Sequence, residues 1–132
     1  MATDKPDIKP TRHQVQERFL CRLADIADGG SKEVALREDS PFSLCLVRQK
    51  DTIYAYVNSC PHTGAPLNWG TDKFLNWDGA LIQCSFHGAQ FRIHDGLCVW
   101  GPCLHRRLAA VPVVVRDGEI LLPDQDKIPA AR

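Results

Sequence analysis

The chain has 132 residues, of which 44% are hydrophobic and 24% charged, and its formal net charge is zero. This length suits a single domain with its own core. The balanced charge argues against nucleic acid as a partner, and the lack of an apolar run near the roughly 20 residues that span a bilayer argues against a membrane. The polar start MATDKPDIKPTRHQ has no apolar stretch typical of a secretory signal, so we expect a cytoplasmic location. In a reducing compartment, six cysteines favour metal binding over disulfides.

Residues 1–18 contain Pro6 and Pro10 among many charged side chains and are expected to form an N-terminal arm. The rest of the chain divides into short runs rich in Val, Ile, Leu and Tyr with turn residues between them, and each run predicts a strand. In chain order these runs are RFLCRLADI (18–26), KEVAL (32–36), SLCLVRQ (43–49), TIYAYVN (52–58), ALIQC (80–84), AQFRI (89–93), LCVW (97–100) and VPVVVRDGEILL (111–122). In the last run, Asp117-Gly118 suits a two-residue type I′ hairpin turn. Closely spaced strands without a long helical period favour an all-β sandwich or barrel.

Two segments each place one cysteine beside one histidine. Cys60-Pro-His62 lies in NSCPHTGAPLNWG, and Cys84-Ser-Phe-His87 lies in CSFHGAQF. In a zinc finger two cysteines usually share a turn and two histidines share a helix, whereas both pairs here are mixed. Two such loops can surround one tetrahedral ion. They can equally hold a two-iron cluster if both thiolates bind one iron and both imidazoles bind the other.

Cys60-Pro-His62 followed by Cys84-Ser-Phe-His87-Gly88 resembles the Rieske iron–sulfur motif, and the wider pattern resembles Rieske-type ferredoxins. HGAQFRIHDGLCVWGP is similar to the second cluster loop of that family with its following strands and proline loop, and RLAAVPVVVRDGEILL is similar to its closing hairpin. The resemblance implies a Rieske-like antiparallel β-sandwich over residues 19–132, with a small cluster-binding subdomain formed by two loops at about 58–70 and 84–91. It also implies one [2Fe–2S] cluster, with Cys60 and Cys84 on one iron and His62 and His87 on the other.

The spacing between the two motifs departs from this pattern. Twenty-one residues separate His62 from Cys84, a few more than in most Rieske ferredoxins. The extra residues are expected in NWGTDKFLNWDG, where they should lengthen a loop without moving the ligands. The tryptophans of this segment, Trp69 and Trp77, can be core anchors or exposed contact residues, and core packing is predicted for Trp77.

Four cysteines lie outside the ligand set. Cys21 and Cys45 are in apolar runs and are expected to be buried, inert thiols. Cys98 and Cys103 bracket VWGP and can approach each other, although a disulfide is not expected in the cytoplasm.

The resemblance also carries an expectation for the reduction potential. High-potential Rieske proteins of respiratory chains join the two cluster loops by a disulfide, and a serine and a tyrosine donate hydrogen bonds to the cluster and to a cysteine sulfur. The matching positions here are Ala65 and Phe86 for the disulfide, and Ala89 and Phe91 for the donors. Hydrogen bonds to sulfur stabilise the reduced cluster. Their loss predicts a potential in the lower third of the Rieske range of about −150 to +300 mV.

The function implied by the resemblance is a soluble one-electron carrier between a flavoprotein reductase and a terminal oxygenase or similar acceptor. The chain lacks a glycine-rich dinucleotide fingerprint, so it is not expected to take hydride from a nicotinamide or to act as an enzyme alone. The alternatives are a small or regulatory Rieske subunit of a larger oxidoreductase, like the small subunit of assimilatory nitrite reductase, and a structural zinc domain. Arg106 and Arg107, expected near the cluster, are either solvated charges or help to select an acidic partner.

Overall fold

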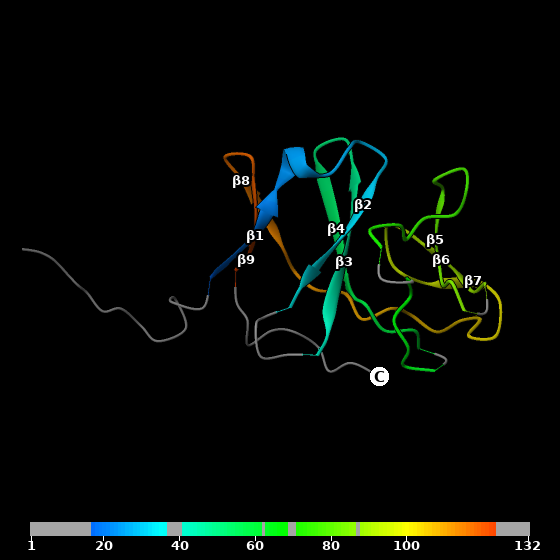
Figure 1. Cartoon of the computed structure of the whole chain (residues 1–132). Coiled ribbons are helices and arrows are strands. Elements are labelled where there is room, and N and C mark those ends of the chain that lie inside the picture. Colours follow the sequence, from blue (N-terminus) through cyan, green and yellow to red (C-terminus); the bar gives the residue numbers. More distant parts are fainter. Residues whose placement is uncertain (1–16, 37–40, 62, 69–70, 87, 124–132) are drawn as a thin grey trace, which may run out of the picture.

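The structure is a computed structural model that describes residues 17–36, 41–61, 63–68, 71–86 and 88–123. Within these residues the chain forms three antiparallel sheets of three strands each, with one short 3-10 turn between the first two strands (Figure 1). The prediction of an all-β fold is therefore confirmed. No helix in the described part of the chain is long and apolar enough to cross a membrane.

Two of the three sheets share one core. Their strands, in the order in which they pair, are β1 (Arg18–Arg22), β9 (Glu119–Leu122) and β8 (Val114–Arg116) in one sheet, and β2 (Ser31–Ala35), β3 (Ser43–Gln49) and β4 (Thr52–Val57) in the other. The core between them contains Cys21, Ile26, Leu36, Leu44, Leu46, Ala55, Val57, Val111, Ile120 and Leu122. Because β1 pairs with β9, the first and last described strands are neighbours in the same sheet.

The third sheet forms a smaller unit beside this sandwich (Figure 1). It consists of β5 (Leu81–Gln83), β6 (Gln90–Arg92) and β7 (Cys98–Trp100). The first predicted ligand segment precedes β5 in the chain, and the second joins β5 to β6. Its side chains belong to a second core that also contains Cys45 and Val47 of β3.

Strand β3 is the wall that the two cores share. Successive side chains of a strand point to opposite faces, and here Leu44 and Leu46 enter the first core while Cys45 and Val47 enter the second. All four side chains are fully buried. This explains why SLCLV reads as a continuous apolar run, and it fixes the small sheet to the sandwich.

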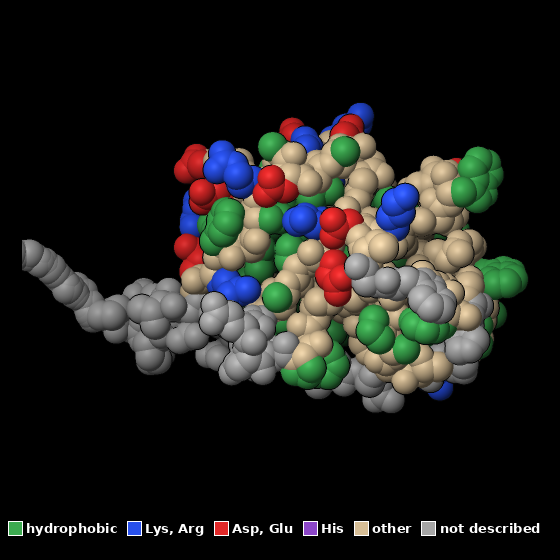
Figure 2. All heavy atoms as spheres, in the orientation of Figure 1, with side chains coloured by type: hydrophobic (Ala, Val, Ile, Leu, Met, Phe, Trp, Pro, Cys, Tyr) green, Lys and Arg blue, Asp and Glu red, His purple; other side chains and the backbone are tan. Residues whose placement is uncertain are grey.

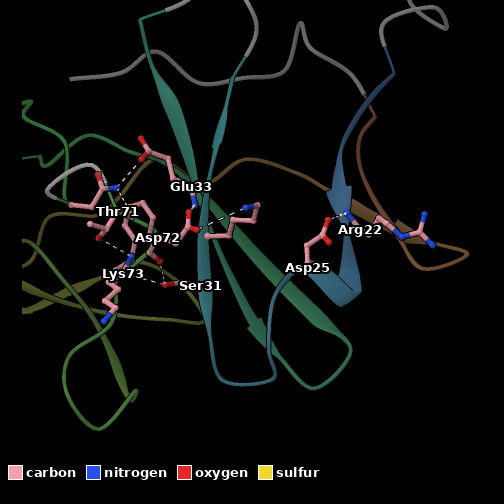
Figure 3. A network of polar contacts seen from close by, with 10 residues as sticks. Arg22, Asp25, Ser31, Glu33, Thr71, Asp72 and Lys73 are labelled. Atoms are coloured by element: carbon pink, nitrogen blue, oxygen red, sulfur yellow. Dashed lines mark hydrogen bonds and ion pairs between the residues drawn. The ribbon is translucent and has the colours of Figure 1, made fainter.

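The predicted opening strand at 18–26 is shorter in the structure. β1 ends at Arg22, and Leu23–Asp25 form the 3-10 turn, η3. The Arg22 N–H donates to the Asp25 carboxylate at 2.9 Å (Figure 3), and the Leu23 N–H donates to Gly118 O at 2.9 Å. An aspartate that accepts a hydrogen bond from a nearby backbone N–H favours a turn over an extended strand.

The other predicted strands are confirmed, with their ends shifted by at most three residues. The closing hairpin has the predicted turn, because Asp117 and Gly118 have φ values of 54° and 77°, as a type I′ turn requires. Residues 1–16 of the predicted arm lie outside the described residues. Arg18, the last residue of the predicted arm, belongs to β1 and pairs with Leu122.

The prediction that Trp77 packs in the core is wrong, because its side chain is 96% exposed. Trp77 is a central residue of a tight turn in which the Gly79 N–H donates to Asn76 O at 2.9 Å. The turn directs the indole into solvent, and Phe74, which is 1% exposed, fills the core position instead. Trp69 lies outside the described residues.

Candidate metal centre

The two segments that carry the predicted ligands fold into matching loops. In each, the cysteine C=O accepts from the glycine four residues later, and the cysteine N–H donates to the alanine five residues later. The four bonds are Gly64 N to Cys60 O at 2.6 Å, Cys60 N to Ala65 O at 2.8 Å, Gly88 N to Cys84 O at 3.0 Å and Cys84 N to Ala89 O at 2.8 Å. Gly64 and Gly88 have φ values of 80° and 72°, which glycine adopts without steric strain. The described ends of the two loops therefore share the same pair of backbone hydrogen bonds, although the loop sequences differ.

The structure brings the two predicted cysteine ligands into one core. Cys60 is 1% exposed and Cys84 is 0% exposed, and both belong to the cluster of side chains beneath the small sheet. His62 and His87 lie outside the described residues. Among the residues that are described, which include only these two predicted ligands, no group of three or more His, Cys, Asp or Glu is arranged to hold a metal ion.

The two loops are tied to each other through the backbone. The Ser85 N–H, next to Cys84, donates to Leu67 O at 2.7 Å. The Leu67 N–H in turn donates to the side-chain oxygen of Asn58 at 2.7 Å, two residues before Cys60. Both cysteines are thus held in a single hydrogen-bonded frame.

A buried polar cluster, which we call the Glu33 network, anchors the first loop to β2. It consists of Glu33, Ser43, Asn58 and Asn68, and both asparagines are buried. The Asn58 amide donates to Asn68 Oδ1 at 2.8 Å and to Glu33 Oε2 at 3.2 Å, and the Asn68 amide donates to Glu33 Oε1 at 2.8 Å. The Ser43 hydroxyl donates to Glu33 Oε2 at 2.6 Å. Sequence reasoning missed this network, whose one local sign was an asparagine on either side of the first loop.

The segment with the extra residues is docked on the same strand, as Figure 3 shows. Asp72 accepts from the Glu33 N–H at 3.0 Å, and its C=O accepts from the Ser31 hydroxyl at 2.6 Å. The Phe74 N–H donates to the Ser31 oxygen at 3.1 Å. The added length therefore packs along β2 and leaves the frame that joins the two cysteines intact.

A third loop, after β7, closes over both ligand loops. A Cβ at Gly101, where φ is 107°, would lie 2.8 Å from Ala89 Cα, so only glycine allows this close approach to the second loop. The Arg106 guanidinium donates to Pro61 O in the first loop at 3.0 Å. Arg106 is thus an exposed residue whose guanidinium also contacts the cluster-binding region. Arg107 lies 3.4 Å from the Asp95 carboxylate and keeps an exposed side chain.

All six cysteines lie in the described part of the chain, and none of them forms a disulfide. Cys21 and Cys45 are buried, as predicted, and burial raises the pKa of both thiols. Cys98 and Cys103 do approach each other, with 3.3 Å between their sulfur atoms. Burial, and then the neighbouring Cys98 thiol, raises the pKa of Cys103 to about 12.

Exposed apolar side chains surround the outer end of the ligand loops. Phe86, Trp100 and Leu104, which we call the apolar rim, are 44%, 60% and 47% exposed. Figure 2 shows hydrophobic side chains at the surface of the part that carries β5–β7, whereas Lys, Arg, Asp and Glu gather over the β1 and β2 end. On the face shown, the surface of this part is therefore largely apolar.

Known proteins with similar sequences and structures were found. The profile of the Rieske [2Fe-2S] domain matches residues 16–119. Ferredoxin CarAc of Metapseudomonas resinovorans is 31% identical over 108 residues, which cover 82% of this chain and 94% of the relative. The ferredoxin component of the p-cumate 2,3-dioxygenase system of Pseudomonas putida is 32% identical over 103 residues, which cover 78% and 81%. A chain in the solved complex of reduced oxygenase and oxidized ferredoxin in carbazole 1,9a-dioxygenase has a TM-score of 0.65 and 28% identity, with 82% and 93% covered.

The profile match spans strands β1 to β8 and both ligand loops, so it is not limited to the short motifs. It agrees with the matching loop geometry and confirms the [2Fe–2S] cofactor that the resemblance to Rieske proteins implied. The chain belongs to the Rieske [2Fe-2S] domain family.

Proposed function

We propose that this protein is a one-electron carrier whose [2Fe–2S] cluster is held by Cys60, His62, Cys84 and His87. The observation that carries the proposal is the pair of matching loops, each with one buried cysteine at its start and one histidine two or three residues later. A thiolate and an imidazole from each loop form the donor set that a Rieske cluster requires. When bound, the cluster accepts and releases one electron.

The residues around the loops fit this cofactor. The buried positions of Cys60 and Cys84 suit the iron that thiolates bind, because burial excludes water from the sulfur atoms. The Glu33 network and the Arg106–Pro61 hydrogen bond hold the first loop, while Gly101 lets the third loop pack on the second. The chain's own contribution is to fix the four ligands and to keep the protein around them rigid.

The proposed partners are a flavoprotein reductase as donor and a terminal oxygenase or similar acceptor, in the cytoplasm. One relative is named as the ferredoxin component of a dioxygenase system, and one similar solved chain belongs to a complex of an oxygenase and a ferredoxin. Both names support an acceptor of this class. Electrons would leave beside the apolar rim, whose small size and low charge suit a weak, transient redox contact. The single domain would begin at Arg18, the first residue of β1, and the arm would comprise the residues before it.

Metal analysis of the purified chain tests the ligand assignment. We expect iron and acid-labile sulfide in equal amounts, two of each per chain, and a coloured protein. His87→Ala should prevent stable assembly, since one iron would lose a ligand, whereas His94→Ala should not, because His94 is an exposed side chain of the β6–β7 turn. Full cluster content in His87→Ala would show that the ligand assignment is wrong. Zinc in place of iron in the parent protein would support the alternative of a structural zinc domain.

A further inference from the structure

An exposed tryptophan lies on a hydrogen-bonded turn that precedes β5. The Trp77 side chain is 96% exposed, and the loop that leads into β5 projects from the rest of the molecule (Figure 1). The Gly79 N–H donates to Asn76 O at 2.9 Å, the Leu81 N–H donates to Asn76 Oδ1 at 3.1 Å, and the Asn76 N–H donates to Leu81 O at 2.9 Å. Tryptophan is enriched among the residues that carry the energy of protein contacts, and a backbone that is already ordered loses little freedom on binding. Trp77 is therefore presented as an interface anchor is.

A surface hollow of about 510 Å³ lies directly beside this tryptophan. It is lined by Gly30, Ser31, Asp72, Lys73, Leu75, Asn76 and Trp77. Two of its walls are joined, because the Ser31 hydroxyl donates to Asp72 O at 2.6 Å (Figure 3). The volume falls within the range of roughly 300–1,000 Å³ that is typical of sites for small organic molecules, so an indole ring fits in it. None of the lining residues belongs to a ligand loop or to the apolar rim.

Trp77 and the hollow, which together we call the Trp77 patch, are complementary to a second copy of the same patch. In a two-fold symmetric dimer, the same surface of both copies meets. A protruding side chain beside a hollow allows each copy to insert Trp77 into the hollow of the other. Leu75, which lines the hollow, supplies apolar surface to the incoming ring.

The charges of this region are complementary to a second copy as well. Lys73 and Asp78 are both exposed, and neither side chain forms an ion pair with another described residue. A two-fold rotation can place Lys73 against Asp78 of the partner subunit, and it then does so twice. The formal net charge of the chain is zero, so no overall repulsion opposes association of two copies.

We propose that the Trp77 patch is the contact of a two-fold symmetric homodimer, in which each Trp77 enters the hollow of the other copy. The inference goes beyond the proposed function and does not depend on it, because the patch contains no residue of the ligand loops. The patch is small beside the roughly 20–30 residues per side of a standard interface. The dimer should therefore be weak and depend on protein concentration.

Sedimentation equilibrium of the purified chain over a concentration series tests this contact. The average mass of the parent should rise from that of one chain toward that of two. Trp77→Ala should raise the dimer dissociation constant by about tenfold or more, since an anchoring tryptophan carries much of the energy of a contact. Trp100→Ala, which changes an exposed tryptophan outside the patch, should dimerise as the parent does. A parent that stays monomeric at every concentration, or an equal loss of the dimer in both variants, would overturn the proposal.

Exchange of charges tests the two-fold arrangement itself. Lys73→Glu and Asp78→Lys should each weaken the dimer, because like charges then meet across it. An equimolar mixture of these two variants should restore association, because both charge pairs of the mixed dimer are again opposite in sign. A mixture that stays monomeric would contradict the proposed geometry.

The iron and sulfide content of the same samples separates this inference from the proposed function. A parent that dimerises without iron and sulfide would contradict the proposed function alone. A monomeric parent with a full cluster would contradict this inference alone.

Discussion

Asp95 joins several side chains in the turn between β6 and β7. Its carboxylate accepts from the Arg92 guanidinium and from the Leu97 N–H at 3.0 Å, and it lies 3.4 Å from Arg107 Nη1. The hydrogen bond from Arg92 is the main reason why the pKa of Asp95 lies well below its usual range. Folding therefore stabilises the charged form of Asp95 relative to its protonated form.

We expect Asp95→Asn to lower the thermal unfolding midpoint at pH 7. A carboxylate whose pKa is lower in the folded state stabilises the protein above its unfolded pKa of about 4, and this stabilisation is lost as the pH falls toward the folded pKa. The gap between parent and variant should therefore narrow below about pH 4. Asp51→Asn is the control, because Asp51 is 94% exposed and 3.9 Å from Arg48. A difference in unfolding midpoint between parent and variant that stays constant with pH would contradict a stabilising role for the Asp95 charge.

Arg106 and Arg107 form a second matched pair at this scale. Arg106 donates to Pro61 O in the first ligand loop, whereas Arg107 contacts Asp95. We expect Arg106→Ala to lose its cluster to a chelator up to about tenfold faster, because a hydrogen bond from a charged donor to the loop is removed. The loss of visible absorption in excess EDTA measures the rate. Arg107→Ala should match the parent, and equal acceleration in both variants would argue against a specific role for Arg106.

At the scale of elements, two turn glycines allow the energetic cost of backbone strain to be distinguished from the cost of crowding by a side chain. Gly96 and Gly118 have φ values of 72° and 77°, but a Cβ at Gly96 would lie 2.8 Å from the Tyr56 ring and 3.3 Å from Leu108 Cβ, whereas nothing lies within 4 Å at Gly118. The Tyr56 ring cannot easily yield, since its hydroxyl donates to Ile93 O at 2.5 Å. Position 96 therefore requires glycine both for its backbone conformation and for lack of space beside Tyr56. Position 118 requires it for the backbone conformation alone.

The free energy of unfolding in denaturant should rank these two substitutions. Gly118→Ala should cost about 1 kcal/mol, the penalty of a side chain in a left-handed conformation. Gly96→Ala should cost a further 1–3 kcal/mol or so, because the added methyl group overpacks the core. Equal losses in the two variants would mean that Tyr56 moves aside without penalty.

The elements that sequence reasoning predicted well are those with local causes. The Asp117-Gly118 turn follows from two adjacent residues, and the strands follow from short apolar runs. The prediction failed where a turn overrode apolar character, as at Trp77. It could not find the Glu33 network, because Glu33 is 25 and 35 residues away from the asparagines that it binds.

The same division holds for the candidate site. The four proposed ligands were visible as two mixed pairs, because spacing within each loop is local. The contact from Arg106 to Pro61, which supports the first loop, depends on how the third loop folds back over the first. Sequence pattern alone contains no distance between those segments.

At the scale of the whole molecule, Trp77 and Trp100, which are the exposed tryptophans among the described residues, allow a docking surface to be told apart from other exposed apolar side chains. Trp100 belongs to the apolar rim and lies beside the second ligand loop, 3.5 Å from where a Gly88 Cβ would be. Trp77 is more exposed but belongs to the turn at 76–79. Replacing the two residues is therefore expected to have different kinetic effects.

Stopped-flow electron transfer to an oxygenase acceptor should slow by about tenfold in Trp100→Ala, since buried aromatic anchors carry much of the energy of a protein contact. Trp77→Ala should transfer electrons at the rate of the parent, and both variants should keep the visible spectrum. If Trp77→Ala is slowed as much as Trp100→Ala, or if neither is slowed, the apolar rim is not the docking surface.

The central claim is that one cluster is held jointly by two cysteines and two histidines, and pulsed electron paramagnetic resonance on the reduced protein with ¹⁵N-labelled histidine tests it most directly. We predict one unpaired spin per chain, coupled to the labelled nitrogen of two imidazoles, because His62 and His87 bind the same iron. Loss of one of these couplings in His87→Ala, in whatever cluster remains, would agree with the assignment. A spin without histidine coupling would contradict it and indicate ligation by cysteines alone, with Cys98 and Cys103 in place of the two histidines.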